Sequence, residues 1–127
     1  MPLVRISVPQ STSAQDIEAV SESVHQALVA HCSVPLADKF HLVQRHAGDE
    51  LICTPEFLGV QHTTKVVMVQ IFLSAGRSLE AKKALYAQIS QQVAATSSFT
   101  ASDVIINLSE TTRENWSFGN GIAQYAV

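Results

Sequence analysis

The sequence predicts an α+β fold in which duplicated βαβ units form a four-stranded mixed sheet, with two helices on one face and short hairpins outside it. Two observations predict this fold. Segments with the alternating pattern of strands flank segments with the 3.6-residue period of helices. This order occurs twice at a constant spacing, which marks an internal duplication. A chain of 127 residues fits one domain, residues 1–127, with a core of its own.

The first half contains a strand, a helix and a second strand. Residues 2–8 alternate apolar and polar side chains and predict the first strand. Ser13 stands three residues before Asp16, a pattern typical of a helix start. Apolar residues then recur at helical spacing to about Cys32, and residues 39–45 predict the second strand.

The second half repeats this order after a connector, residues 46–59, which we expect to form a hairpin or a loop. Residues 65–73 are apolar and rich in β-branched side chains, so they predict a buried strand. Ser78 opens a second helix, and residues 103–108 form the returning strand. The glycines within residues 116–126, with aromatic residues on both sides, predict a C-terminal hairpin.

The two pseudo-repeats, about residues 2–45 and 66–109, superimpose at one offset of 65 positions. The matched pairs are Ser13 with Ser78, Ala19 with Ala84, Val24 with Ile89, Leu28 with Val93, and Asp38 with Asp103. Each half is a βαβ unit, which requires parallel strands and a right-handed crossover.

A shared sheet with a pseudo-two-fold axis brings three chemical groups to one edge. The first and third strands then run antiparallel, so Pro2 lies beside the loop that carries Arg77. Asp38 precedes the second strand and lies at the same end. At the opposite edge the repeat places Val67 and Thr12 where Pro2 and Arg77 stood, and that edge therefore lacks the amine and the guanidinium.

These groups suit proton transfer on small carboxylated carbonyl compounds. Removal of Met1 leaves Pro2 with a secondary amine, and α-amino groups titrate near ~7.7–8.0 before burial lowers the pKa further. Such an amine is a base near neutral pH. Arg77 precedes a helix N-terminus and can bind a carboxylate in bidentate fashion. Asp38 can orient a water, relay a proton or hold the amine.

The residues resemble a known family. The Met-Pro start, the duplicated βαβ units and the arginine after the third strand resemble the tautomerase superfamily of N-terminal proline enzymes. The segments VPLADKFHLV, QIFLSAGRSLEAKKALY and ENWSFGNGIAQY resemble its malonate semialdehyde decarboxylase-like branch. The resemblance implies a cofactor-independent homotrimer, with Pro2 as acid or base, Arg77 on the substrate carboxylate and Asp38 in an assisting role. It also implies a pocket wall built from Trp116, Phe118 and Tyr125.

One departure from that branch bears on the reaction. The decarboxylases carry a second arginine close before the first, whereas Ala75 and Gly76 occupy this stretch here. We therefore expect a keto–enol tautomerase of a small 2-oxo/enol carboxylic acid. A malonate semialdehyde-type decarboxylase or hydratase is the alternative, and a non-catalytic trimeric ligand-binding module is an alternative of another class.

Each site residue also has a structural interpretation. Met-Pro is a common start, and an aspartate after Pro35 is often part of a turn. The match between Asp38 and Asp103 indicates at least a structural role for this aspartate. Trp116 and Phe118 share a face of any strand and can belong to a core or a subunit interface.

Composition excludes several classes of function. Eight scattered Lys and Arg residues and a net charge of −3 exclude a nucleic-acid or anionic membrane surface. Two isolated cysteines form no disulfide framework, and no signal peptide or membrane span is evident, so we expect a cytoplasmic protein. The five histidines have no metal-ligand spacing, and we expect neither metal nor cofactor.

Overall fold

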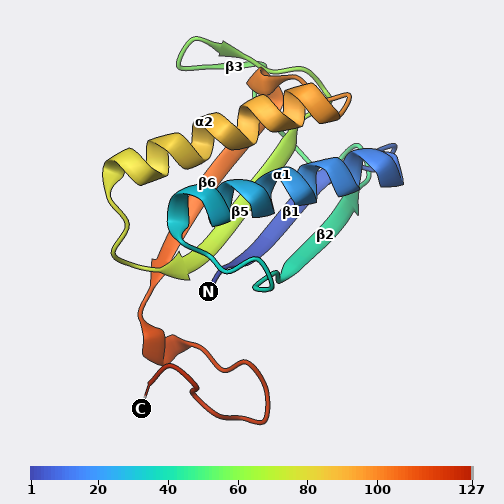
Figure 1. Ribbon diagram of the computed structural model, residues 1–127. Coiled ribbons are helices and arrows are strands. Elements are labelled where there is room, and N and C mark those ends of the chain that lie inside the picture. The colour runs from blue at the N-terminus through green and yellow to red at the C-terminus, as the bar shows by residue number, and fades with distance from the viewer. Residues whose placement is uncertain (127) are drawn as a thin grey trace.

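The computed structural model, which describes residues 1–126, confirms the predicted fold: a four-stranded mixed sheet with both helices on one face (Figure 1). The main elements are β1 (Leu3–Pro9), α1 (Ala14–Cys32), β2 (His41–His46), β5 (Val67–Ser74), α2 (Leu79–Thr96) and β6 (Val104–Thr111). A small hairpin, β3 (Glu56–Phe57) with β4 (Val60–Gln61), and two 3₁₀ turns, Ala101–Asp103 and Arg113–Asn115, complete the order.

The sheet has the order β2-β1-β5-β6 and is built from two parallel pairs. β1 runs parallel to β2, and β5 runs parallel to β6, as two βαβ units require. The two units meet where β1 and β5 pair antiparallel, with Leu3 opposite Phe72. The start of the chain therefore lies beside the end of β5 (Figure 1).

The duplication extends to the helix caps. The side chain of Ser13 accepts a hydrogen bond from the backbone N–H of Asp16 at 3.0 Å. Ser78 accepts the matching bond from Ala81 at 3.1 Å. Such caps satisfy N–H groups that a helix leaves without partners, and they hold both helices in the same relation to the strand before them.

The two strand-to-helix junctions are also held by matching backbone bonds. Gln10 donates to the carbonyl of His46 at 2.8 Å, and Ala75 donates to the carbonyl of Thr111 at 2.9 Å. In each unit the chain leaving the first strand is thus tied to the end of the second. The residues that follow β5 and β6 consequently lie at one common edge.

The core lies between the sheet and the helices. Alternate side chains of β1 and β5 face the helices and are buried, as the period of two requires. The helices contribute one buried stripe each: Val20, Val24 and Leu28 from α1, and Leu85, Ile89 and Val93 from α2. Burial of each such side chain stabilises the fold by about 1.5–3 kcal/mol. Within residues 1–126, neither helix combines the length and apolar character needed to cross a membrane.

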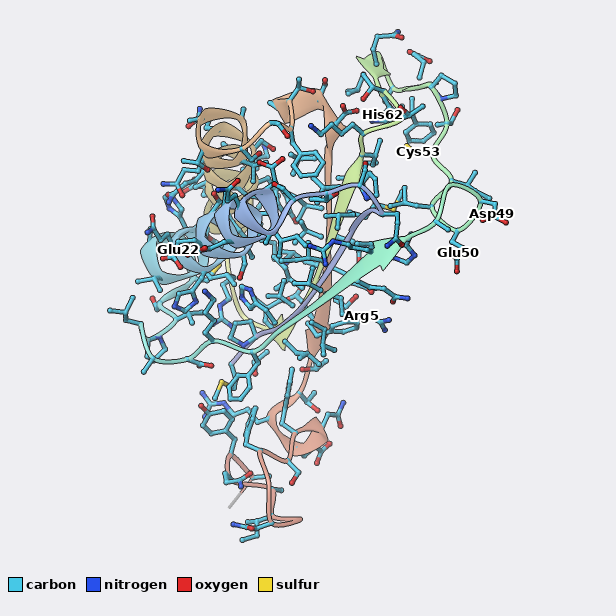
Figure 2. The ribbon with its side chains drawn as sticks, turned by 90° about the vertical axis from the view of Figure 1, so that its right-hand side faces the viewer. Arg5, Glu22, Asp49, Glu50, Cys53 and His62 are labelled. Carbon is cyan, nitrogen blue, oxygen red and sulfur yellow. The ribbon has the colours of Figure 1, made fainter. Side chains whose placement is uncertain are left out.

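The other face of the sheet carries no covering layer among residues 1–126. Figure 2 shows Arg5 on the side away from the helices. Leu42, which pairs with Arg5, is 57% exposed. A sheet face that is left open while carrying apolar side chains indicates a further contact surface.

Outside the sheet, the structure differs from the sequence prediction in the C-terminal segment. The connector contains the short β3–β4 hairpin, but the hairpin predicted over residues 116–126 is not formed. The side chain of Gln124 closes this segment instead. Its Oε1 accepts from the backbone of Phe118 at 2.9 Å, and its Nε2 donates to the carbonyl of Gly119 at 3.1 Å. These bonds replace the strand pairing, so the segment folds as a loop.

Candidate active site

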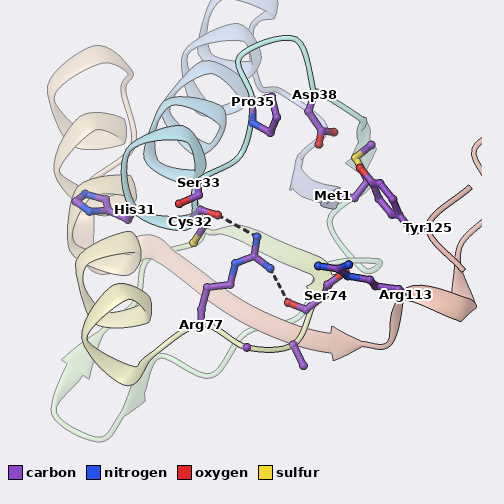
Figure 3. Close-up of a pocket in the computed structure, with 12 residues that line it drawn as sticks. Met1, His31, Cys32, Ser33, Pro35, Asp38, Ser74, Arg77, Arg113 and Tyr125 are labelled. Atoms are coloured by element: carbon purple, nitrogen blue, oxygen red, sulfur yellow. Dashed lines mark hydrogen bonds between the residues drawn. The ribbon is translucent and has the colours of Figure 1, made fainter. Parts of the chain in front are cut away.

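A cavity of about 530 Å³ opens at the edge of the sheet where β1 begins and β5 ends (Figure 3). Its lining comes from Met1, the end of α1 with the loop to Asp38, and the loop from Ser74 to Arg77. Arg113 and Tyr125 from the C-terminal segment complete it. The topology therefore brings the start, the middle and the end of the chain to one site.

The N-terminal amine, which is that of Met1 in this structure, lies at this cavity. Burial is the main influence on it and lowers its pKa below the ordinary value of 8.0. The charges of Arg77 and Arg113 lower the pKa further, whereas the carboxylate of Asp38 raises it. Pro2, the next residue, is buried immediately before β1 begins. A free amine at this place is shifted toward its neutral, basic form.

Asp38 faces the cavity with an unused oxygen. The residue is 8% exposed, and its Oδ1 is buried without a hydrogen-bond partner among the described residues. Its backbone N–H donates to the carbonyl of Pro35 at 2.9 Å, which closes the turn that carries it. Figure 3 shows the carboxyl group directed toward Met1. A buried carboxylate oxygen that lacks a donor is suited to accept one from a ligand or an amine.

The equivalent aspartate at the opposite edge is fully occupied. Asp103 accepts from the backbone N–H of Thr63 at 2.8 Å and from its hydroxyl at 2.6 Å. The hydroxyl of Thr100 lies 3.3 Å from the same carboxylate. Asp103 therefore holds loops together, and the structure gives Asp38 no such pair of donors. The structural role suggested by the repeat is that of the turn closed by the backbone of Asp38, while its carboxylate accepts no hydrogen bond from residues 1–126.

Arg77 connects two loops at the floor of the cavity. Its Nη1 donates to the carbonyl of Ser74 at 2.6 Å, and its Nη2 donates to the carbonyl of Cys32 at 2.9 Å. Figure 3 shows both bonds. A guanidinium has five N–H donors, so Arg77 keeps donors for a carboxylate while it orders the site.

Arg113 is a cavity residue that the sequence analysis missed. It opens the 3₁₀ turn after β6, beside the loop that follows β5. The signal that could have located it is the parallel pairing of β5 with β6, because residues that follow two parallel strands meet at one edge. The sequence analysis ended the last strand at residue 108, whereas β6 ends at Thr111, so it did not place Arg113 just after the strand.

The aromatic residues divide into two groups. Tyr125 lines the cavity, whereas Trp116 and Phe118 lie outside the lining and form a stack. Their ring centroids are 5.5 Å apart at 9°, and Phe118 contacts Tyr125 edge-on at 5.4 Å. The indole N–H of Trp116 donates to the hydroxyl of Thr111 at 2.7 Å. Phe118 also packs on Phe40, at 5.9 Å. The stack thus anchors the C-terminal segment to β6 and to the chain before β2.

Two other chemistries find little support at this edge. Burial raises the pKa of the Cys32 thiol, with the charge of Arg77 opposing this only in part, so the thiol is a poor nucleophile at neutral pH. Among residues 1–126, no three His, Cys, Asp or Glu side chains gather closely enough to hold a metal ion.

The opposite edge of the sheet also has a cavity, of about 560 Å³. Its described lining includes His46, Cys53 and His62, but no arginine, lysine or carboxylate. This lining therefore has no counterpart of the amine, Arg77 or Arg113, which is the asymmetry expected from the repeat.

Comparisons with solved structures identify close relatives of this fold. An FG41 malonate semialdehyde decarboxylase inhibited by 3-bromopropiolate is similar with a TM-score of 0.90 and 34% identity, covering 97% of this chain and 93% of that chain. A fused 4-OT wild type symmetric trimer is similar with a TM-score of 0.77 and 25% identity, covering 98% of both chains.

Sequence comparisons agree with this likeness. The probable tautomerase YusQ of Bacillus subtilis (strain 168) is 32% identical over 124 residues, which cover 98% of each chain. The family model described as a tautomerase enzyme matches residues 38–119, a range that begins at Asp38 and includes both cavity arginines. The chain therefore belongs to the tautomerase family.

Proposed function

We propose that this protein is a keto–enol tautomerase of a small 2-oxo/enol carboxylic acid and acts through the amine of Pro2 once Met1 is removed. One observation carries the proposal: a single cavity brings together the start of the chain, the free carboxylate oxygen of Asp38 and the guanidinium of Arg77. Family membership supports the same chemistry.

In this mechanism Arg77 binds the substrate carboxylate and places the enol against the amine. The neutral amine of Pro2 takes the proton of the enol hydroxyl, and the electron pair of that O–H bond forms the carbonyl. The electrons of the carbon–carbon double bond take a proton from the resulting ammonium at the adjacent carbon. The amine is restored, and no atom is gained or lost. Asp38 stabilises the ammonium between the two steps, since its free oxygen can accept a hydrogen bond from it.

Tyr125 closes the cavity over the substrate in this proposal, and Trp116 and Phe118 form the wall behind it through their stack. Aromatic side chains exclude water, and exclusion of water strengthens the interaction between the guanidinium and the carboxylate. The site requires neither a metal nor a cofactor, because an amine and two charged side chains complete the proton transfer.

The direct test is to free or block the nitrogen of Pro2. A form with a protease-removable N-terminal extension is assayed with an aryl enolpyruvate before and after cleavage that leaves Pro2 first. We expect activity only after cleavage, because an acylated nitrogen is neither a base nor an acid. Intact mass should show that the active protein lacks Met1. Equal activity in both forms, or an active protein that retains Met1, would refute the catalytic role and favour a non-catalytic module.

The pH profile separates this mechanism from its alternative. Burial, together with Arg77 and Arg113, lowers the pKa of the Met1 amine below 8.0 against the opposing charge of Asp38, and we expect the same direction for the amine of Pro2. As a base, Pro2 gives an activity that rises through that pKa and is constant above it. In a decarboxylase or hydratase mechanism the amine works in its protonated form, and activity falls over the same range.

Two observations favour a decarboxylase or hydratase function. The chain is similar to a malonate semialdehyde decarboxylase, and the cavity holds a second arginine, Arg113, although residues 75 and 76 are not arginine. Release of carbon dioxide from malonate semialdehyde is the measurement that would establish this activity.

We also propose that the protein is a cytoplasmic homotrimer. The uncovered face of the sheet carries the half-exposed Leu42, and one structural relative is a symmetric trimer. Cys32 and Cys53 are free, which fits a reducing compartment. Light scattering should give three times the protomer mass.

A further inference from the structure

We propose that Arg113 binds a second acidic group of the substrate, so that the natural substrate is an enol acid with two anionic groups. This rests on the proposed function, because it assigns the cavity to an enol acid. The inference rests on two observations. Arg77 makes two hydrogen bonds within the protein, whereas Arg113 makes none with residues 1–126, and Arg113 lies at the exposed side of the cavity.

Arg77 is partly a structural residue. Its bond to the carbonyl of Ser74 is matched at the opposite edge by a bond between the equivalent residues of the repeat. There the hydroxyl of Thr12 donates to the carbonyl of Pro9 at 2.7 Å. Thr12 stands 65 positions before Arg77, and Pro9 stands 65 before Ser74. The opposite edge keeps this bond although its cavity has no arginine or lysine in the described lining, so the bond serves the strand-to-helix turn. Arg77 has a further bond to the carbonyl of Cys32.

The side chain of Arg113 is not held by comparable hydrogen bonds. Its side chain makes no hydrogen bond or ion pair with any residue between 1 and 126. Glu110, three residues earlier, pairs with Lys82 at 2.7 Å and is not available to it. The guanidinium is exposed to solvent at the rim of the cavity, and its charge acts on the N-terminal amine. With respect to residues 1–126, all five of its donors are therefore free for a ligand.

The backbone around Arg113 is fixed even though its side chain is free. On one side, the carbonyl of Thr111 accepts from Ala75 at 2.9 Å, and the hydroxyl of Thr111 accepts from Trp116 at 2.7 Å. On the other side, Asn115 donates to the carbonyl of Thr112 at 3.1 Å. A cation on a held turn, directed into a cavity (Figure 3), is preorganised to bind an anion.

The cavity can take two acidic groups, because its described lining holds two guanidiniums, Arg77 and Arg113. Among the described residues no ion pair joins Asp38 to either of them, and in the proposed mechanism this carboxylate serves the ammonium of Pro2. One carboxylate satisfies Arg77 at the floor. A second acidic group toward the opening satisfies Arg113. The opposite edge has Gly48 at the position 65 residues before Arg113 and thus lacks this second cation as well.

The test compares one substrate with one carboxylate and one with two: the enol forms of phenylpyruvate and of oxaloacetate. Arg113→Gln should raise the KM for the oxaloacetate enol by roughly tenfold or more, because it removes the charged hydrogen bonds to the second carboxylate. Its effect on the KM for the phenylpyruvate enol should be at least fivefold smaller. Lys83→Gln, which removes an exposed positive charge of α2 outside the cavity, is the matched control and should leave both values unchanged.

Equal effects of Arg113→Gln on the two substrates, or none on either, would overturn this role for Arg113 and leave the tautomerase mechanism intact. If the wild type with a free Pro2 is inactive on both enols, the proposed function fails instead. Binding then decides the role of Arg113 by itself: calorimetric titration with malonate and with propionate should show a loss of affinity in Arg113→Gln for malonate only. Equal losses for both acids would overturn it.

Discussion

Asp38 and Asp103 occupy equivalent places in the repeat but have different surroundings. Two donors of Thr63 hold the carboxylate of Asp103, whereas Oδ1 of Asp38 is buried without a partner among residues 1–126. A bond to a charged group stabilises a fold by about 1.5–3 kcal/mol, and an unpaired buried oxygen contributes none of this. The same residue type is therefore structural at one edge and available for chemistry at the other.

We expect that replacing each aspartate in turn by asparagine will separate the effect on stability from the effect on activity. Asp103→Asn should lower the free energy of unfolding by about 1–3 kcal/mol, because it weakens two charged hydrogen bonds. Asp38→Asn should reduce kcat at least tenfold and change the free energy of unfolding little. Urea denaturation and the enol assay measure the two effects. A stability loss in Asp38→Asn as large as that of Asp103→Asn would contradict this division.

His41 should make stability depend on pH. Burial lowers its pKa from 6.5 to about 4, with smaller contributions from Lys39 and His25 that Glu22 opposes. The unfolded chain therefore binds a proton at this residue between these values and the folded chain does not. Stability should fall as the pH drops from 6.5 toward 4 and change no further through His41 below that. Thermal unfolding of the wild type and of His41→Gln measures it, and an equal slope in both would disprove the assignment.

At the scale of elements, the sequence predicts the strands and helices of the sheet well because each has a periodic pattern and a cap. Ser13 and Ser78 both cap the helices that they predict. The edge at Pro2, Asp38 and Arg77 follows from the strand directions alone. The C-terminal segment could not be predicted in this way. Its conformation depends on the side chain of Gln124 and on contacts with Phe40, which lies far from it in the sequence.

The aromatic stack should matter more for the cavity than for the fold. Phe118→Ala removes contacts with Phe40, Trp116 and Tyr125, each worth about 0.5–1.5 kcal/mol. Because these residues lie outside the main core, the unfolding midpoint in urea should change little. The KM should rise about tenfold, since Tyr125 and the turn of Arg113 lose their support. A large stability loss with an unchanged KM would show that the stack belongs to the core.

At the scale of the whole molecule, the open sheet face should determine the assembly. Leu42 lies on this face and is 57% exposed, whereas Leu79 is 64% exposed at the start of α2. Leu42→Glu should dissociate the proposed trimer, because it places charges in the contact between sheets. Leu79→Glu should leave it intact. Sedimentation velocity distinguishes the protomer from the assembly, and a wild type that sediments as a protomer would refute the trimer.

The global fold could be predicted because an internal duplication determines topology as well as secondary structure. A helix between two parallel strands allows one crossover hand, and two such units share a sheet in few ways. Arg113 could not be located by this logic, because Gly48 stands at its place in the first unit. A functional residue that occurs in only one half cannot be found by comparing the two halves.

The pseudo-two-fold relation has a consequence for how many catalytic centres a fused pair of βαβ units can hold. A single chain has one N-terminus, although the repeat gives it two equivalent sheet edges. The nitrogen of Val67, the counterpart of Pro2, is part of a peptide bond, whereas that of Pro2 becomes a free amine once Met1 is removed. Side-chain replacement at the vacant edge could restore a guanidinium there, but no substitution can create a second chain start. Cleavage of the peptide bond before Val67 is the modification that would create this second N-terminus.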